Sequence, residues 1–196
     1  MPKATMPEPK LPRMYIENCE QYSEWLMLEY RHCAQSWPGL VFTNVTDRKL
    51  FEALSPLGAV KRSSLARLAE FKPRSTIVLD PAAPKVLTAS DLDRAGALVV
   101  GGILGSEGFT GKTGRFLTEK LGCRARNLGK TQLSIDSAVV VCRLIALGMK
   151  LDKIQLSTEL EIVHDDGHST ILPYGYPVLD GKVIFTPGLR EYLRKH

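Results

Sequence analysis

The sequence is poor in cysteine, and its four cysteines do not form a recognisable set. Cys19, Cys33, Cys123 and Cys142 are scattered, with no CxxC pair and no histidine at the spacing of metal ligands. Structural zinc sites bring such residues together within a few positions of one another. We therefore expect no bound metal, and reduced thiols of the kind that cytoplasmic proteins carry.

Long hydrophobic stretches are also missing. No apolar run approaches the ~20 residues that a membrane-spanning helix needs. Residues 1–13 are rich in proline and lack the apolar core of a signal peptide. We expect a flexible N-terminal tail over residues 1–13, a cytoplasmic location and no membrane contact.

A large excess of either charge is lacking too. The 196 residues include 26 Lys and Arg against 21 Asp and Glu, which gives a net charge of +5. This small basic excess permits an RNA or ribosomal partner without requiring one. The length suits one domain with an appendage.

Short apolar segments alternate with segments of helical pattern, which predicts an α/β fold with a mostly parallel five-stranded sheet. The expected strands are 14–17, 40–45, 75–79, 97–100 and 124–128. Helices are expected over 23–36, 46–54, 63–71, 111–120 and 134–149, with a single turn near residue 91. Expected N-caps are Ser23, Thr46 or Asp47, and Ser90 with Asp91.

The pattern changes after Met149. Asp166-Gly167 and Asp180-Gly181 each suit the turn of a β-hairpin. A final helix is expected to start at Thr186-Pro187, with proline in its first position. We therefore expect a domain over residues 14–156, followed by a small β-rich C-terminal extension over residues 157–196.

Glycine or proline marks the chain where three of the expected strands end. The three stretches are Leu79-Asp80-Pro81, Gly101-Gly102-Ile103-Leu104-Gly105, and Leu128-Gly129 with the residues up to Ser134. Glycine allows positive φ and a close approach of backbone to a ligand. Ligands of parallel α/β sheets bind beyond the carboxyl ends of the strands. The pattern predicts three loops that together hold one small molecule.

A nucleotide triphosphate is one alternative ligand. Gly111-Lys112-Thr113 is similar to the end of a phosphate-binding loop. That motif needs four residues between its two glycines, whereas five separate Gly105 from Gly111. The spacing therefore disfavours an NTPase.

The same stretches, in the same order, carry a family resemblance. Tyr15-Ile16-Glu17, Ser23-Glu24-Trp25 and Leu28-Glu29-Tyr30 look like an N-terminal signature, and the three loops look like the cofactor loops that follow it. The chain resembles the small archaeal and eukaryotic branch of the SPOUT (α/β-knot) methyltransferases, which includes a fungal arginine methyltransferase of a ribosomal protein. The resemblance implies a C-terminal trefoil knot, a rarity among folds, and S-adenosylmethionine as methyl donor. The residues that it implies for cofactor binding are Leu79, Asp80, Pro81, Gly101, Gly102, Ile103, Leu104, Gly105, Leu128, Gly129, Gln132, Leu133, Ser134 and Ala138.

An arginine acceptor would need a carboxylate, because the guanidinium group is protonated at ordinary pH. Glu17, Glu24 and Asp80 are the candidates, since each lies at the edge of one of these motifs. Glu24 also follows the expected cap Ser23, so it could instead be a favourable first-turn charge. For Asp136 a capping or loop-fixing role is expected rather than catalysis.

Two other functions remain open from the sequence. The acceptor could be a base or ribose of tRNA or rRNA, with phosphates held by basic residues around the loops; these are Lys112, Arg115, Lys120, Arg124, Arg126 and Lys130. Aromatic residues for base stacking are sparse there, only Phe109 and Phe116. The chain could also be an idle module that only binds the cofactor. Residues 138–147 are apolar nearly all round, which suits either a core helix of a monomer or a knot-face homodimer.

Overall fold

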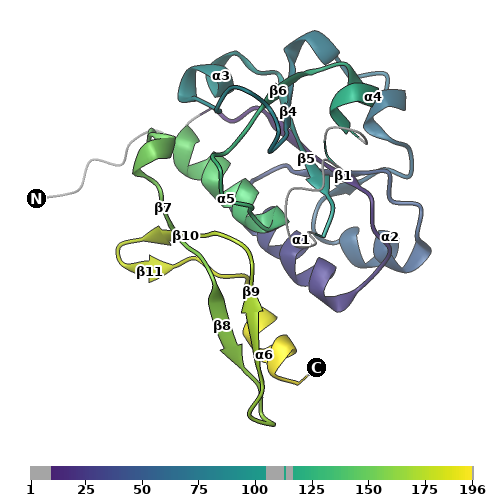
Figure 1. The fold of residues 1–196 in the computed structure, drawn as a ribbon. Coiled ribbons are helices and arrows are strands. Elements are labelled where there is room, and N and C mark those ends of the chain that lie inside the picture. Colours follow the sequence, from purple (N-terminus) through teal and green to yellow (C-terminus); the bar gives the residue numbers. More distant parts are fainter. Residues whose placement is uncertain (1–9, 105–112, 114–116, 196) are drawn as a thin grey trace, which may run out of the picture.

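A parallel sheet forms the centre of the protein. The computed structural model describes residues 10–104, 113 and 117–195. In this part of the chain the sheet has six strands, in the order β3-β2-β1-β5-β4-β6, and every pairing is parallel (Figure 1). The strands are β1 (Arg13–Asn18), β2 (Val41–Thr43), β3 (Ala59–Val60), β4 (Thr76–Leu79), β5 (Ala97–Gly102) and β6 (Arg124–Arg126).

The prediction of five strands was one too few. The additional strand β3 has two residues and lies at the edge of the sheet beside β2. It directly follows Pro56-Leu57-Gly58, and so short a segment carries no alternation from which a strand could be predicted. The other five strands are those expected.

The sheet is apolar on both faces, as expected for a parallel sheet that is covered on both sides. In β1, Met14 and Ile16 belong to the large core cluster, whereas Tyr15 belongs to a second cluster on the opposite face. In β5, Leu98 and Val99 divide in the same way between the two clusters.

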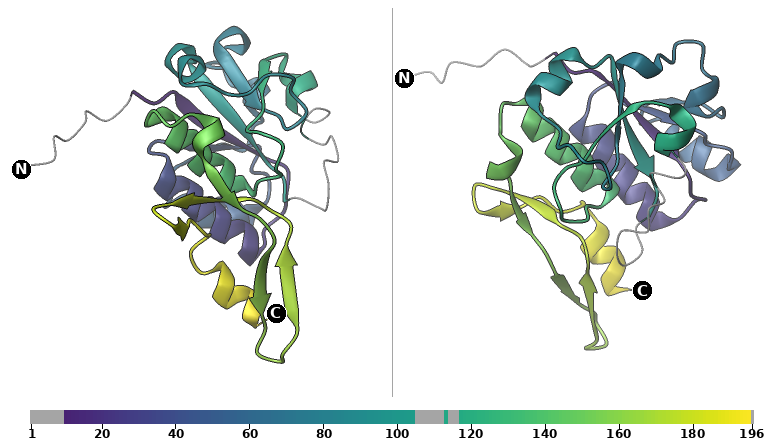
Figure 2. Two further views of the ribbon diagram at one scale, coloured as in Figure 1. Left: turned by 60° about the vertical axis from the view of Figure 1, so that its left-hand side comes forward. Right: turned by 45° about the horizontal axis from the view of Figure 1, so that its top comes forward.

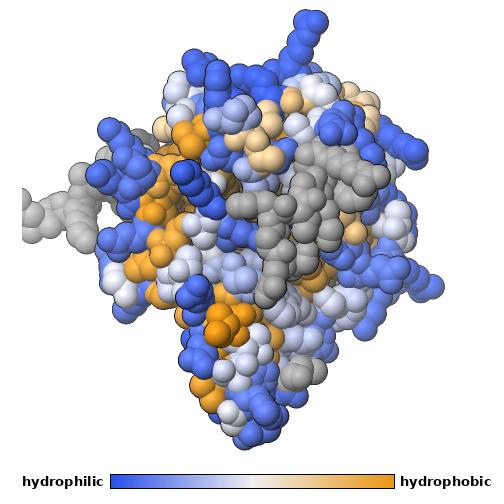
Figure 3. Space-filling model, viewed as in Figure 1, coloured by the Kyte–Doolittle hydropathy of each residue, from blue (hydrophilic) through white to orange (hydrophobic). Residues whose placement is uncertain are grey.

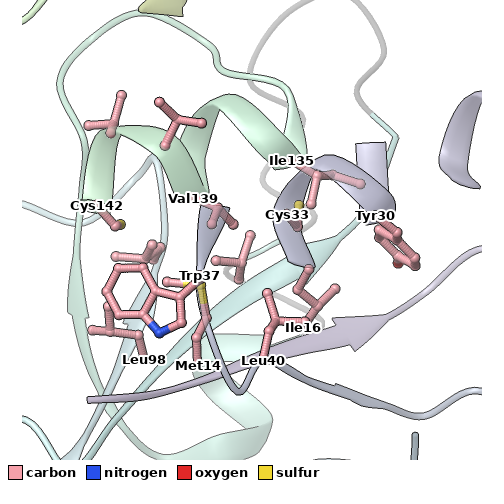
Figure 4. Packing of buried hydrophobic residues seen from close by; sticks show 14 of the residues in the cluster. Met14, Ile16, Tyr30, Cys33, Trp37, Leu40, Leu98, Ile135, Val139 and Cys142 are labelled. Carbon is pink, nitrogen blue, oxygen red and sulfur yellow. The ribbon is translucent and has the colours of Figure 1, made fainter. Parts of the chain in front are cut away.

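Two long helices cover the face with the large cluster: α1 (Glu24–Ser36) and α5 (Ile135–Ala146). Figure 4 shows Trp37 beside Cys142, with Val139 about one turn nearer the start of α5. Ser23 and Ser134 cap the two helices, and Asp47 caps α2 (Arg48–Leu54). The cap Ser23 was correctly predicted, and Asp47 was one of the two caps considered for α2; no cap had been predicted for α5.

Other helix boundaries differ from the prediction. The helix α3 (Ala89–Arg94) is capped by Thr88 rather than Ser90, because Thr88 and Asp91 form a reciprocal capping box. The expected helix 63–71 is only a 3₁₀ turn, η1 (Leu65–Arg67). Pro187 precedes the last helix, α6 (Leu189–Arg194), instead of starting it. Half of the expected helix 111–120 lies outside the described residues, and the structure places α4 at Glu119–Leu121.

Both predicted hairpins are present after residue 156. The strands β8 (Leu160–Val163) and β9 (Ser169–Leu172) pair around Asp166-Gly167, and β10 (Tyr176–Leu179) and β11 (Lys182–Val183) pair around Asp180-Gly181. In addition, β10 pairs with β7 (Gln155–Ser157). The β8–β9 hairpin extends away from the central sheet, with α6 against it (Figure 2).

The C-terminal strands pack against α1, one of the helices that cover the central sheet. A third apolar cluster combines residues of β8, β9 and α6 with Trp25 and Leu28 of α1. At the other end of the chain, Pro12 is buried and its carbonyl accepts a hydrogen bond from Trp37 Nε1 at 3.2 Å, so part of the expected tail 1–13 is packed. None of the helices in the described residues combines the length and the apolar character that crossing a bilayer requires.

Candidate active site

The three loops singled out in the sequence leave the sheet side by side. They follow β4, β5 and β6, which are neighbours in the order β5-β4-β6, and all of them leave at the carboxyl edge. We call residues 80–87 the first loop, the chain from residue 103 the second loop, and residues 127–134 the third loop. Gly105, a predicted cofactor residue, lies outside the described residues.

Asp80 holds the start of the first loop. Its backbone N–H donates to the carbonyl of Arg126 at 2.9 Å, which continues the pairing of β4 with β6. Its carboxylate accepts hydrogen bonds from the N–H of Ala82 at 2.9 Å and from Thr118 Oγ1 at 2.6 Å. The adjacent Pro81 is exposed. Asp80 is thus buried, and both of its carboxylate oxygens are engaged in shaping the loop.

The glycines before the second loop are explained by close packing. A Cβ at Gly102 would collide with the Tyr30 hydroxyl of α1, and one at Gly101 would lie 2.8 Å from Leu117 Cδ1. The carbonyl of Gly102 accepts a hydrogen bond from Cys19 at 3.0 Å. The loop backbone therefore lies directly against the connection between β1 and α1.

That connection contributes residues that the sequence did not reveal. Tyr30 Oη donates to Asn18 Oδ1 at 2.8 Å, and Leu104 N donates to Glu20 Oε1 at 3.2 Å. Glu20 thus anchors the start of the second loop at Leu104. These partners are distant in sequence, and only a motif common to relatives could have pointed to them.

The third loop is fixed at both ends. At its start, Gly129 has φ of +99°, and its N–H donates to Asn127 Oδ1 at 2.9 Å. Near its end, the carbonyl of Gln132 accepts from Gly175 N at 2.8 Å, and Leu133 forms a bridge with Gly175. Ser134 then caps α5, and the half-buried Ala138 lies in the first turns of that helix. The C-terminal segment is therefore part of the structure that holds this loop.

The other two predicted carboxylates lie in different surroundings. Glu17 is buried in β1, where its carboxylate accepts hydrogen bonds from Thr43 Oγ1 and, at 3.0 Å, from Leu65 N. Glu24 is exposed in the first turn of α1, after the cap Ser23. Its side chain makes no hydrogen bond to the described residues. Of the three predicted carboxylates, Glu24 is therefore the one that is open to a substrate.

Behind the loops lies a buried pair of acids that sequence reasoning did not identify as a pair. Glu29 accepts from Trp25 Nε1 at 2.6 Å and from the N–H of Ile135 at 3.0 Å. Asp136 lies beside it, and its carboxylate contacts His32 Nδ1 at 2.7 Å and Thr186 Oγ1 at 2.6 Å. Burial, and then the negative charge of Asp136, raise the pKa of Glu29 to about 8. The expected loop-fixing role of Asp136 agrees with these contacts.

A pocket of about 750 Å³ adjoins the third loop. Leu128 and Gly129 form part of its wall, together with Leu87, Val141 and Ile145. Figure 3 shows apolar side chains on this side of the molecule, to the left of the view, where α3, the end of α5 and β7 lie in Figure 1. The third loop therefore borders a pocket with largely apolar walls.

This geometry fits a known family. A sequence model described as SFM1-like protein arginine N-methyltransferase matches residues 13–196. The chain belongs to that family. The prediction of a SPOUT methyltransferase is confirmed, and the SFM1-like protein is an enzyme of the methyltransferase class.

Solved structures share the fold of this SFM1-like methyltransferase. The yeast arginine methyltransferase SFM1 complexed with SAM has 24% sequence identity and a TM-score of 0.84, covering 96% of this chain and 92% of the yeast chain. Its complex with SAH gives a TM-score of 0.82 at the same identity, covering 92% and 94%. A dual-specific Trm10 from Thermococcus kodakaraensis has 19% identity and a TM-score of 0.53, covering 72% of this chain and 96% of its own. Comparison with curated proteins returns no match.

Proposed function

We propose that this SFM1-like enzyme transfers the methyl group of S-adenosylmethionine to an arginine side chain of a ribosomal protein. The observation that carries the proposal is the meeting of three loops at one sheet edge, in a chain that matches an arginine methyltransferase family over residues 13–196. The structural relatives that were solved with SAM and SAH support the choice of cofactor.

The loops have the features that a nucleoside-bearing ligand requires. Gly101 and Gly102 let the chain enter the second loop through a closely packed site, and Gly129 turns the third loop through positive φ with open space where a side chain would stand. S-adenosylmethionine supplies a methyl group on a positively charged sulfur. We assign its binding to the loop residues predicted above, mostly through their main-chain groups. The trefoil knot, the domain boundary at residues 156 and 157, and the cytoplasmic location belong to the same proposal.

The chemistry assigns different roles to the three carboxylates. As the acceptor nitrogen bonds to the methyl carbon and the carbon–sulfur bond breaks, a guanidinium proton must leave to a base or to water. Glu24 is exposed and can approach an incoming arginine, whereas Asp80 and Glu17 are buried and engaged in hydrogen bonds. We therefore propose that Glu24 orients the acceptor, and that Asp80 shapes the first loop.

The test uses radiolabelled S-adenosylmethionine and undermethylated ribosomes. We expect label in the protein fraction, removed by protease and resistant to nuclease, and recovered as methylarginine after hydrolysis. Glu24→Gln should lower kcat by at least about tenfold while leaving cofactor affinity unchanged, since its charge is needed only with the acceptor in place. Glu52→Gln is the matched control, because Glu52 is an exposed glutamate of α2 that pairs with Arg48.

Three outcomes would contradict the proposal. Label lost to nuclease and retained after protease would make the acceptor an RNA. Binding of the cofactor without transfer to any ribosomal fraction would favour an idle binding module. Unchanged turnover in Glu24→Gln would remove that residue from the mechanism.

The RNA alternative is weakened by Arg126, whose guanidinium group is bound to Asp91 at 2.9 Å and is thus engaged within the fold.

A further inference from the structure

Asn127, the first residue of the third loop, connects two of the loops. Its backbone N–H donates to the carbonyl of Lys85 at 2.9 Å, and its carbonyl accepts from Leu87 N at 2.9 Å. These contacts extend the sheet by one bridge, with Asn127 parallel to Val86. The end of the first loop is thus paired with the start of the third.

The side chain adds two further hydrogen bonds, one to each loop. Asn127 Nδ2 donates to the carbonyl of Ala83 at 2.7 Å, and Oδ1 accepts from Gly129 N at 2.9 Å. An amide side chain can donate from its nitrogen and accept at its oxygen at the same time. Both partners are backbone atoms, so the side chain fixes the course of the chain itself.

The position of these contacts matters for a ligand held by backbone groups. Gly129 has φ of +99°, and its N–H direction is set by Asn127 Oδ1. Ala83 lies three residues after Asp80, whose N–H and carboxylate hold the beginning of the same loop. Asp80 therefore holds the beginning of the first loop, and Asn127 holds its later part. Asn127 also fixes the turn at Gly129, which Asp80 does not contact.

We propose that Asn127 is a positioning residue that holds the first and third loops in the arrangement that binds S-adenosylmethionine. The inference rests on the proposed function, because the loops matter as the cofactor site. Ordering a loop at the moment of binding costs conformational entropy, and a loop ordered beforehand avoids that cost. Asn127 therefore sets cofactor affinity, while the transfer step depends on other residues.

Two substitutions separate the parts of the interaction. Asn127→Ala removes both side-chain hydrogen bonds and leaves the backbone pairing. Asn127→Asp keeps the acceptor for Gly129 but places an oxygen against the Ala83 carbonyl. The stability control is Asp47→Ala, which removes the cap of α2, where Asp47 Oδ1 accepts from Leu50 N at 2.6 Å. It lowers stability without contacting any of the three loops.

Calorimetry with S-adenosylmethionine and amide hydrogen exchange of the ligand-free protein test the inference. Asn127→Ala should weaken cofactor affinity by about tenfold or more, as expected for two lost hydrogen bonds. At saturating cofactor, kcat should stay near the wild-type value, and exchange should become faster in residues 83–87 and 127–134. Asn127→Asp should weaken binding as well, whereas Asp47→Ala should bind as wild type does.

The outcomes separate this inference from the proposed function. Wild-type protein that does not bind S-adenosylmethionine overturns the proposed function, whatever the variants do. Unchanged affinity in Asn127→Ala, or an equal loss in Asp47→Ala, overturns the positioning role. Unchanged exchange in the two loops of Asn127→Ala would also overturn it, and this last result does not depend on cofactor binding.

Discussion

Glycine at position 102, just before the second loop, has two possible explanations: contact with the cofactor and packing against α1. Gly102 was singled out as a cofactor residue because paired glycines end an apolar strand. In the structure, the space of a side chain at this position is filled by the Tyr30 hydroxyl. Packing against α1 is therefore sufficient to require glycine here, and a contact with the cofactor stays a prediction that needs a separate test.

Gly102→Ala should lower the free energy of unfolding by about 2 kcal/mol, because the new methyl group overpacks a buried site. Tyr30→Phe removes the colliding hydroxyl and its hydrogen bond to Asn18, and alone should cost about 1 kcal/mol. In the double variant the loss should be smaller than the sum of the two, as measured by urea denaturation. Strict additivity would show that the hydroxyl is not what excludes a side chain from this position.

Glu29 should make stability depend on pH. Its pKa is raised to about 8 by burial and by Asp136, so the folded protein keeps a proton that the unfolded chain releases above about pH 4. The free energy of unfolding should therefore fall as the pH rises from about 4 to about 8. Above this window Glu29 should cause no further change in stability. Urea denaturation of wild type and Glu29→Gln at pH 5 and at pH 7.5, both within the window, should show a smaller decline in the variant.

Glu52→Gln is the control for that comparison, since Glu52 is exposed and should leave the pH dependence unchanged. A decline in Glu29→Gln as steep as that of wild type would assign the pH dependence to another group.

Among the elements, local signals were enough where a cap or a turn determines the boundary. Ser23 caps α1 as expected, Asp47 is the one of two expected alternatives that caps α2, and both Asp-Gly turns close hairpins. Where two local signals compete, tertiary context decides between them. Thr88 caps α3 because Asp91 also binds Arg126 of β6, and these hydrogen bonds hold the pKa of Asp91 below its usual value although burial acts to raise it.

The positions of the three loops could be predicted from the sequence, but the side-chain contacts that hold the loops could not. Glycine and proline marked the three strand ends, because they are properties of the chain itself. Asn127 and Glu20 act through partners in other elements, and Glu29 through a helix more than 100 positions away in sequence. A single sequence does not indicate which side chains meet, so these residues could not be found from it.

The contact between α5 and the C-terminal segment includes a hydroxyl group, that of Thr186, which should contribute to stability. Thr186 Oγ1 donates to the buried Asp136 carboxylate at 2.6 Å. Thr186→Val keeps the shape but leaves this acceptor with one partner fewer, which should cost about 1–2 kcal/mol in the free energy of unfolding.

The matched control is Thr170→Val in the β8–β9 hairpin, where the threonine contacts the half-buried His164. It should cost less than about 0.5 kcal/mol by the same urea denaturation. Equal losses in the two variants would mean that the contact of Thr186 with Asp136 has no special weight.

At the scale of the whole molecule, the C-terminal segment contacts the third loop, α5 and α1. Gly175 pairs with the third loop, Thr186 binds Asp136, and the third apolar cluster contains Trp25 and Leu28 of α1. The sequence predicted the two hairpins of this segment. It did not predict these connections, which arise from the path of the chain after α5.

A chain ending at residue 156 should therefore be poorly stable. The truncation exposes apolar surface on α1 and removes one partner of the third loop, so we expect a lowered melting temperature and weakened binding of S-adenosylmethionine. Calorimetry and thermal unfolding measure the two effects. A truncated chain with wild-type stability and affinity would show that residues 157–196 form an independent unit.

The two tryptophans belong to two different apolar clusters. Trp37 is fully buried in the large core cluster, whereas Trp25 lies where α1 meets the C-terminal cluster and donates its indole N–H to Glu29. The protein thus carries its own pair of fluorescent reporters, one for each cluster. Emission from single-tryptophan variants can therefore reveal whether the chain melts in one step or whether the C-terminal part separates first.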